Sequence, residues 1–160
     1  ILLLSKIEHQ SIQTRQNWYR LDEQIRQSIV MMEPKWSEKE IEFDVDMMDV
    51  EYLGNENLIC HVWDNLLSNA IKFSPCGGTI YIRMMPEGEK IRFSIENEGP
   101  QISEYSMKHI FDKFYQGDSS HKQEGNGLGL ALVKQILNLC MGTVSVENIP
   151  GSGCRFTVIL

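Results

Sequence analysis

Polar side chains recur at helical spacing in the stretch HVWDNLLSNAIKF, which occupies residues 61–73. If the stretch is wound at about 100° per residue, Asn65, Asn69 and Lys72 gather on one face. An amide oxygen is a natural ligand for a hard cation, and a lysine one turn further on can reach a phosphate. The face therefore indicates either a metal and phosphate site or an ordinary solvated surface. The opposite face is apolar and predicts the side that packs on the core: Val62, Trp63, Leu66, Leu67, Ala70, Ile71 and Phe73.

A second candidate is the stretch EGNGLGLALVKQI at residues 124–136, where Gly125, Gly127 and Gly129 directly precede a good helix-forming sequence. Glycine inside a helix costs about 1 kcal/mol relative to alanine, so one interpretation is a loop that ends where the helix begins. The alternative is a phosphate cradle, because backbone N–H groups at a helix N-terminus attract anions and glycine lets them approach. A dinucleotide-binding motif is disfavoured, because a polar loop rather than a strand precedes the glycines.

Composition limits the partners of the chain. Its 160 residues form one domain, and 42% hydrophobic with 23% charged residues is typical of a soluble globular protein. The net charge of −7 argues against nucleic acid or a membrane surface as a partner, so a phosphate would have to be met by a metal ion or backbone amides. The cysteines, Cys60, Cys76, Cys140 and Cys154, form no C-x-x-C pair and indicate reduced, mostly core residues in the cytosol.

Hydrophobic periodicity predicts a mixed order of elements. We expect helices at 1–14, 22–32, 56–73, 106–113 and from the glycines to about 141, and strands at 17–21, 40–46 and 50–53, with hairpins at 77–99 and 142–160 turning at 86–88 and 150–153. Pro34 should end the second helix, and residues 116–126 form a polar loop. Because strands and helices do not alternate regularly, we predict an α/β fold with one sheet and helices on one face.

The stretches HVWDNLLSNAIKFSP, IENEGPQIS, IFDKFYQGD and EGNGLGLALVKQI occur in this order. They resemble the N, G1, F and G2 boxes of the ATP-binding domain of bacterial sensor histidine kinases. The similarity extends from about residue 17 to residue 160. It implies the GHKL fold, an α+β two-layer sandwich with a mixed, mostly antiparallel sheet, helices on one face and a mobile ATP lid. The opening LLLSKIE is similar to the tail of the second dimerisation helix. We therefore expect 1–14 to be that tail, cut from a longer protein, and 15–160 to be the catalytic ATP-binding domain.

The resemblance implies roles for the residues of the N box. Asn69 would coordinate Mg²⁺ through its side-chain oxygen, and Asn65 would support the phosphates and the metal shell. Lys72 would pair with a phosphate, and Phe73 would form a wall of the nucleotide site. The implied ligands are thus ATP and Mg²⁺.

The other boxes would surround the base and the phosphates. Gly99 and Ile102 would border the adenine, and the backbone amides of the G2 box would meet the phosphates while its glycines let the lid fold over ATP. The remaining positions carried over are the lid hinge, Phe111, Phe114 and Tyr115, and the G2 box, Gly127, Leu128, Gly129 and Leu130.

The chain departs from the family pattern beside the base. Asn97 stands where the family has an adenine-reading aspartate, and its amide oxygen can still accept a hydrogen bond from the adenine amino group. Gln101 replaces the second glycine of the G1 box. Gln116 replaces a basic residue, which would leave charge neutralisation to His121 or Lys122 in the lid. These departures favour a weak or tightly regulated kinase.

The resemblance also separates transfer from hydrolysis. Related gyrase-like ATPases carry a water-activating glutamate at the position of Asn65, whose amide cannot act as a general base. No histidine in the chain is followed by an acidic residue, as the family's phosphoacceptor is. We therefore expect a histidine kinase lacking its phosphoacceptor, so that no catalytic residue in the strict sense lies in this chain.

The expected partners are ATP, an upstream dimerisation domain of the same or a partner chain and, for the full-length protein, a response regulator. Nucleic acid and membrane contacts are not expected of this domain, which would lie on the cytoplasmic side of a membrane sensor. The alternatives are a nucleotide-binding pseudokinase without transfer activity and a free-standing GHKL ATPase.

Overall fold

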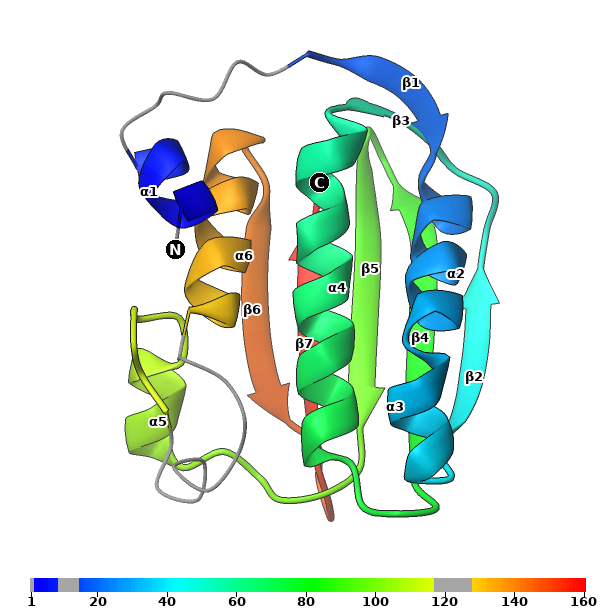
Figure 1. Cartoon of the computed structure of the whole chain (residues 1–160), viewed down its shortest axis with the longest axis vertical. Helices are drawn as coiled ribbons and strands as arrows, with labels where there is room; N and C mark the ends of the chain where they lie inside the picture. The colour runs from blue at the N-terminus through cyan, green and yellow to red at the C-terminus, as the bar shows by residue number, and fades with distance from the viewer. Residues whose placement is uncertain (1, 9–14, 117–127) are drawn as a thin grey trace.

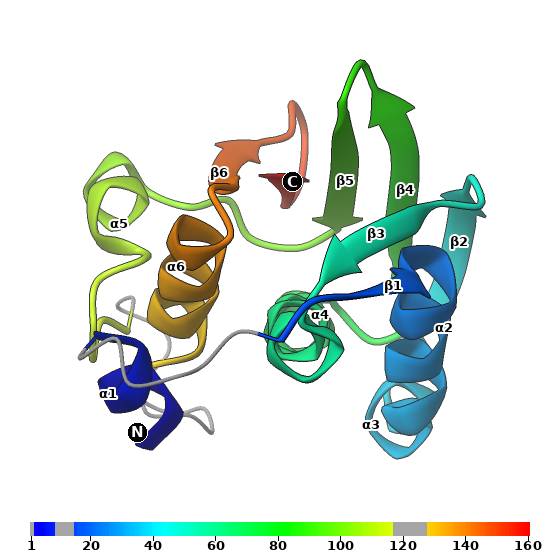
Figure 2. The ribbon, with the colours of Figure 1, turned by 90° about the horizontal axis from the view of Figure 1, so that it is seen from above.

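The structure is a computed structural model that describes residues 2–8, 15–116 and 128–160. In it a layer of helices lies on one face of a five-stranded sheet (Figures 1 and 2). The elements are α1 (Leu2–Glu8), β1 (Asn17–Arg20), α2 (Leu21–Met31), α3 (Glu33–Glu38), β2 (Glu42–Met47), β3 (Glu51–Gly54), α4 (Glu56–Phe73), β4 (Thr79–Glu87), β5 (Lys90–Asn97), α5 (Glu104–His109), α6 (Gly129–Leu139), β6 (Thr143–Asn148) and β7 (Cys154–Ile159).

The main sheet has the strand order β2-β4-β5-β7-β6. Strand β2 runs parallel to β4, and the other neighbouring strands are antiparallel. Successive side chains of a strand point to opposite faces, so one face of the central strands is apolar and packs under the helices. On β4, for example, Ile80, Ile82 and Met84 are buried. The predicted mixed, mostly antiparallel sheet with helices on one face is confirmed.

A second, two-stranded sheet was not predicted. Strand β1 pairs with β3 in antiparallel register, and the ribbon crosses the end of the helical layer (Figure 2). The rings of Tyr19 and Tyr52 meet edge to face at a centroid distance of 6.0 Å. Both strands were predicted as separate short segments. Their pairing is invisible in the sequence because helices α2 and α3 and strand β2 separate them along the chain.

Helix α4 forms the centre of the core. Trp63 lies fully buried against Phe93 of β5, with ring centroids 4.7 Å apart. Its indole Nε1 donates a hydrogen bond to Oε1 of Gln24 on α2 at 2.8 Å. Gln24 Nε2 donates in turn to the backbone oxygen of Glu56 at 2.8 Å. This chain of bonds satisfies the buried polar groups and fixes α2 against α4.

The bounds of α4 agree with the predicted helix at 56–73. At its start, Asn55 Oδ1 accepts a hydrogen bond from the backbone N–H of Leu58 at 3.0 Å, which caps the helix. At its end, Lys39 Nζ donates to the carbonyl oxygens of Ile71 at 2.7 Å and Lys72 at 3.1 Å. A lysine at this end satisfies carbonyl groups that have no partner within the helix.

Three local predictions were wrong in detail. Pro34 lies in the first turn of α3 and so begins a second helix, because its missing N–H costs nothing there. Pro86 and Glu87 belong to strand β4, and the tight turn of that hairpin follows at Gly88. The short helix expected at 106–113 begins and ends earlier, as α5, after capping by Ser103. Of the cysteines, Cys154 is buried, whereas Cys60 and Cys140 are half-buried and Cys76 is exposed.

Helix α1 lies beside α6 (Figures 1 and 2). Its Leu4 is buried in a small cluster with Leu128 and Ala131. Glu8 forms an ion pair with Lys113 at 2.9 Å, beyond α5. The rest of the helix predicted at 1–14 lies outside the described residues from residue 9 onward. Among the described residues, no helix has the length and apolar character needed to cross a membrane.

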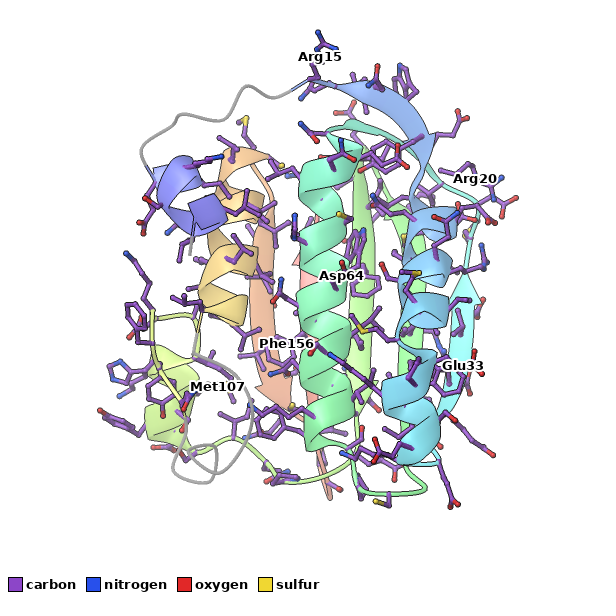
Figure 3. All side chains as sticks on the ribbon, in the orientation of Figure 1. Arg15, Arg20, Glu33, Asp64, Met107 and Phe156 are labelled. Atoms are coloured by element: carbon purple, nitrogen blue, oxygen red, sulfur yellow. The ribbon has the colours of Figure 1, made fainter. Side chains whose placement is uncertain are left out.

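A buried carboxylate ties the ribbon to α2. The side chain of Asp22 is fully buried and accepts hydrogen bonds from Arg20 Nη2 and Arg26 Nη1, both at 2.6 Å, and from the backbone N–H of Val50 at 3.2 Å. Figure 3 shows Arg20 at the junction of β1 and α2. The Arg20 guanidinium holds the pKa of Asp22 well below its usual range, against the opposing effect of burial.

We expect Asp22→Asn to lower the free energy of unfolding at pH 7 by about 2 kcal/mol, because charge-assisted bonds are lost. Since the folded pKa is lowered, the carboxylate stabilises the fold above its unfolded pKa of about 4, and this contribution is lost as the pH falls further. Urea titrations of both proteins from pH 7 to pH 2.5 should show the difference shrinking below about pH 4. The exposed pair of Asp44 with Arg83 offers a control, and Asp44→Asn should cost under about 0.5 kcal/mol.

Candidate functional site

The polar face of α4 lies at the edge of the helical layer. Asn65, Asn69 and Lys72 are all half-buried, while the predicted apolar side is buried except for Phe73, which is half-buried. Lys72 Nζ lies 5.3 Å from the centroid of the Phe73 ring. Burial lowers the pKa of the Lys72 ammonium, so this charge is held in a partly desolvated setting. A cation in such a setting attracts an anion more strongly than one in open solvent.

The N-terminus of α6 lies directly against this face. A Cβ atom at Gly129 would lie only 2.8 Å from Asn65 Oδ1, so a larger residue here would force the Asn65 side chain to shift. Asn65 Nδ2 is engaged by the backbone oxygen of His61 at 2.7 Å, which directs the amide oxygen toward α6. Leu128 occupies the N-cap position and makes no side-chain capping bond. The structure thus brings the two sequence candidates, the amide face and the glycine-started helix, together.

The two leucines of the glycine-rich stretch have packing partners. Leu128 is buried in the cluster with Leu4, and Leu130 is half-buried against the main core. Gly127 lies outside the described residues. So do residues 117–126, which include most of the predicted lid with His121 and Lys122.

The loop after β5 crosses the C-terminal end of α4. Gly99 has a φ of +128°, and a Cβ atom there would collide with the carbonyl oxygen of Phe73. Only glycine allows this close approach. The loop therefore places Gly99 beside Phe73.

The same loop is fastened to the hairpin of β6 and β7. Asn148 forms two hydrogen bonds with the backbone of Ile102, accepting from its N–H and donating to its oxygen, both at 2.8 Å. Gln101 Nε2 donates to the backbone oxygen of Ile149 at 2.7 Å. Ser152 Oγ accepts from the N–H of Gly99 at 3.2 Å and donates to its oxygen at 3.1 Å.

Sequence analysis missed two of these supports. Asn148 and Ser152 lie about fifty residues from the loop that they hold, and neither stands in a local motif. Gln101 was noted only as a departure from the expected glycine. In the structure, its side chain contributes to the fastening of the loop.

Asn97 is the last residue of β5 and is only 2% exposed. Its Nδ2 donates a hydrogen bond to the backbone oxygen of Glu98 at 2.9 Å. Its Oδ1 accepts from Cys154 Sγ at 3.7 Å. At Gly153, whose φ is +84°, a Cβ atom would collide with the Asn97 backbone oxygen, so the hairpin closes tightly over this residue.

The aromatic residues after α5 are held unequally. Phe111 packs edge to face on Phe156 at a centroid distance of 6.2 Å, and Figure 3 shows Phe156 in the interior. Tyr115 Oη shares a hydrogen bond with Ser106 Oγ at 2.6 Å. Phe114 has a positive φ of 61° and is 67% exposed. Two of the three predicted hinge residues are therefore anchored, and Phe114 is not packed in the core.

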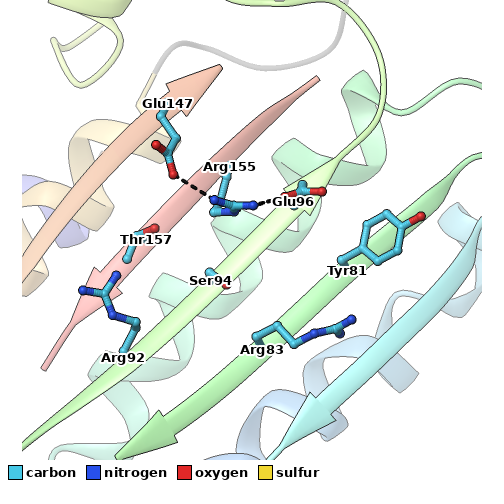
Figure 4. Close-up of a pocket in the computed structure, with 8 residues that line it drawn as sticks. All are labelled: Tyr81, Arg83, Arg92, Ser94, Glu96, Glu147, Arg155 and Thr157. Carbon is cyan, nitrogen blue, oxygen red and sulfur yellow. Dashed lines mark hydrogen bonds and ion pairs between the residues drawn. The ribbon is translucent and has the colours of Figure 1, made fainter. Parts of the chain in front are cut away.

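A hollow of about 430 Å³ lies on the opposite face of the sheet (Figure 4). Arg155 is bonded there to Glu96 at 2.6 Å and to Glu147 at 3.0 Å. None of the sequence-predicted site residues that the structure describes lines this hollow. Its lining consists of Tyr81, Arg83, Arg92, Ser94, Glu96, Glu147, Arg155 and Thr157.

These features, a mixed sheet under a layer of helices with an amide face meeting a glycine-started helix, define a nucleotide-binding domain of the GHKL type. Residues 54–160 match the family described as histidine kinase-, DNA gyrase B-, and HSP90-like ATPases, and the chain belongs to that family. The predicted family and fold are thus confirmed.

Sensor kinases are prominent among the similar proteins. The heme sensor protein HssS of Staphylococcus saprophyticus is 32% identical over 158 residues, which are 99% of this chain and 34% of that protein. The chain therefore spans about a third of the length of this curated relative. Full-length ShkA in complex with AMPPNP matches with a TM-score of 0.86 at 25% identity, over 99% of this chain and 33% of that one. Histidine kinase ThkA in complex with the response regulator TrrA matches with a TM-score of 0.80 at 26% identity, over 99% of this chain and 46% of that one.

Proposed function

We propose that this chain binds Mg-ATP and transfers its γ-phosphoryl group to a histidine on a dimerisation domain outside the chain. The observation that carries the proposal is the close approach of Asn65 Oδ1 to the start of α6, where a Cβ atom on Gly129 would lie 2.8 Å from it. It combines side-chain amides with the backbone N–H groups and positive dipole end of a helix. An acidic domain can hold a triphosphate with such devices without any excess of positive charge.

The α4 face would hold the phosphate end of the nucleotide. Asn69 would bind Mg²⁺ through its amide oxygen, Asn65 would contact the phosphates and Lys72 would pair with one of them. Among the described residues, no cluster of three or more His, Cys, Asp or Glu side chains could hold a metal ion. A single amide oxygen from Asn69 fits Mg²⁺, which takes few protein ligands and completes its coordination shell with water and substrate phosphates. When bound, the ion neutralises charge that develops on the transferred group.

The base end would lie where the loop after β5 crosses α4. Phe73 and Gly99 would contact the base from two sides, Ile102 would border it, and Asn97 would recognise its edge. Leu128 and Leu130 would contribute backbone amides at the phosphate end, together with Gly127. Phe111 and Tyr115 would anchor the hinge of the lid, and the exposed Phe114 would move with the lid.

Transfer to a protein side chain fits this site better than hydrolysis. Asn65 cannot activate a water molecule, and phosphoryl transfer depends mainly on positioning and charge neutralisation. We further propose that residues 1–14 end a dimerisation helix, that residues 15–160 are the catalytic domain, and that a response regulator receives the phosphoryl group. The domain would work in the cytoplasm as part of a membrane sensor, itself touching neither membrane nor nucleic acid.

The decisive experiment supplies the missing substrate. The chain is mixed with the upstream helical domain of its own polypeptide and radiolabelled Mg-ATP, and the helical domain is tested for phosphate. We expect acid-labile, alkali-stable label on that domain. The label should be absent when the helical domain carries a His→Gln substitution at the acceptor.

The result also separates the alternatives. Tight ATP binding without transfer would overturn the kinase proposal in favour of a nucleotide-binding pseudokinase, the alternative that the sequence departures at Asn97, Gln101 and Gln116 suggest. Rapid release of inorganic phosphate without labelled protein would instead favour a free-standing ATPase. Failure to bind ATP at all would overturn the site itself.

A further inference from the structure

The side-chain amide of Asn97 is held between two groups of opposite hydrogen-bonding character. On one side the backbone oxygen of Glu98 accepts from Nδ2 at 2.9 Å. On the other side Cys154 Sγ lies 3.7 Å from Oδ1. Asn97 and Cys154 stand directly opposite each other in the antiparallel pair of β5 and β7, and they are only 2% and 5% exposed.

The Cys154 thiol acts as the donor in this contact. Burial raises the pKa of Cys154 to about 11, so the sulfur keeps its proton at neutral pH. A protonated thiol is a weak donor and a still weaker acceptor. The hydrogen-bond partner that suits a donating thiol is therefore the amide oxygen of Asn97, and not its amide nitrogen.

Rotation of the Asn97 amide by half a turn would disrupt both contacts. Oδ1 would then face the carbonyl oxygen of Glu98, and two acceptors would oppose each other. Nδ2 would face a sulfur that accepts poorly. In the observed orientation, the contact with Cys154 uses one of the two lone pairs of Oδ1, and the contact with Glu98 uses one of the two N–H groups of Nδ2. One lone pair and one N–H therefore remain for a ligand.

A fixed amide distinguishes the two purine bases. The edge of adenine presents an amino donor beside a ring acceptor, whereas guanine presents a carbonyl acceptor beside a ring donor. An amide held in one orientation offers its own acceptor and donor in a fixed order and so matches only one of these edges.

We propose that Cys154 is a positioning residue that holds the Asn97 amide in the orientation matching adenine and so sets the preference for ATP over GTP. This inference rests on the proposed function, because it assumes that Asn97 faces the base. It assigns the thiol to specificity and not to metal binding or redox chemistry. On this inference, an asparagine that could read either base in two orientations is restricted to one of them.

The test is a comparison of dissociation constants for Mg-ATP and Mg-GTP by calorimetry. Cys154→Ala removes the donor, and we expect the ATP-to-GTP preference to fall by about threefold or more, the size of one weak hydrogen bond. Cys154→Ser keeps a donor in nearly the same place and should restore the preference. Cys60→Ala serves as a control, because the Cys60 thiol bonds to the Asn57 oxygen near the start of α4, and it should leave the preference unchanged.

The outcomes distinguish this inference from the function on which it rests. If the unaltered chain binds ATP and Cys154→Ala keeps the same ATP-to-GTP ratio, the inference is wrong and the function stands. An equal fall in Cys154→Ala and Cys154→Ser would also overturn it, because packing and not the donor would then be responsible. If the unaltered chain binds neither nucleotide, the proposed function fails, and the inference fails with it. Thermal denaturation of each variant shows that the folded protein is being measured.

Discussion

Replacement of Asn69 by alanine is expected to weaken Mg-ATP binding by at least about 100-fold, or roughly 2.8 kcal/mol. The reason is the loss of the proposed side-chain ligand for Mg²⁺, without which the acidic domain must meet a triphosphate unaided. The fold should survive, because Asn69 is half-buried on the polar face of α4 and alanine is the better helix former. Calorimetry with and without EDTA measures both the affinity and its dependence on the metal.

Two further variants sharpen this test. Asn57→Ala makes the same change at an exposed position near the start of α4 and should leave binding intact. Asn69→Asp keeps an oxygen ligand but adds a negative charge near the phosphates, so its effect should be intermediate. An unchanged affinity in Asn69→Ala would remove Asn69 from the site and with it the assignment of the α4 face.

Local sequence was sufficient for the elements that carry the proposed phosphate end of the site. The bounds of α4 could be predicted because Asn55 caps an unbroken apolar period that ends before Pro75. The helical spacing also placed Asn65, Asn69 and Lys72 on one face without reference to any other segment. Gly129 was found for the same reason, since its position beside a helix-forming sequence is itself local information.

The proposed base end of the site could not be predicted from local sequence. The contact of Asn97 with Cys154 joins residues that are 57 positions apart, and it exists only because β5 and β7 pair in one register. The sequence identified Asn97 as a departure from the family but contained no sign of what holds its amide. Cys154 was interpreted only as a core cysteine, and its burial supports that interpretation. The sequence did not indicate its hydrogen bond to Asn97.

The pairing of β1 with β3 escaped prediction for the same reason. Each strand is four residues long, and neither has a turn that leads to the other. The proline error has a different cause. A proline after a helical stretch is compatible both with the end of that helix and with the first turn of a new one. Only the structure shows that Pro34 lies in the first turn of α3.

Gly99→Ala is expected to lower the free energy of unfolding by about 3 kcal/mol and to abolish detectable ATP binding. A side chain is strained at a φ of +128°, and its Cβ would collide with the carbonyl oxygen of Phe73. The loop would have to move away from α4, which would separate the two proposed walls of the base site. Urea denaturation and calorimetry measure the two effects.

The matched control for this prediction is Gly88→Ala in the turn after β4. Gly88 also has a positive φ, of 64°, but a Cβ atom there would meet nothing within 4 Å. The Gly88→Ala substitution should therefore cost only the strain of a left-handed residue, about 1 kcal/mol, and leave ATP binding unchanged.

Ser152→Ala provides a milder change at the proposed site, because it removes only the two hydrogen bonds that hold Gly99 to the hairpin of β6 and β7. We expect Ser152→Ala to weaken ATP binding severalfold with little loss of stability. Equal losses of ATP binding in Gly88→Ala and Gly99→Ala would show that the loop after β5 does not shape the site.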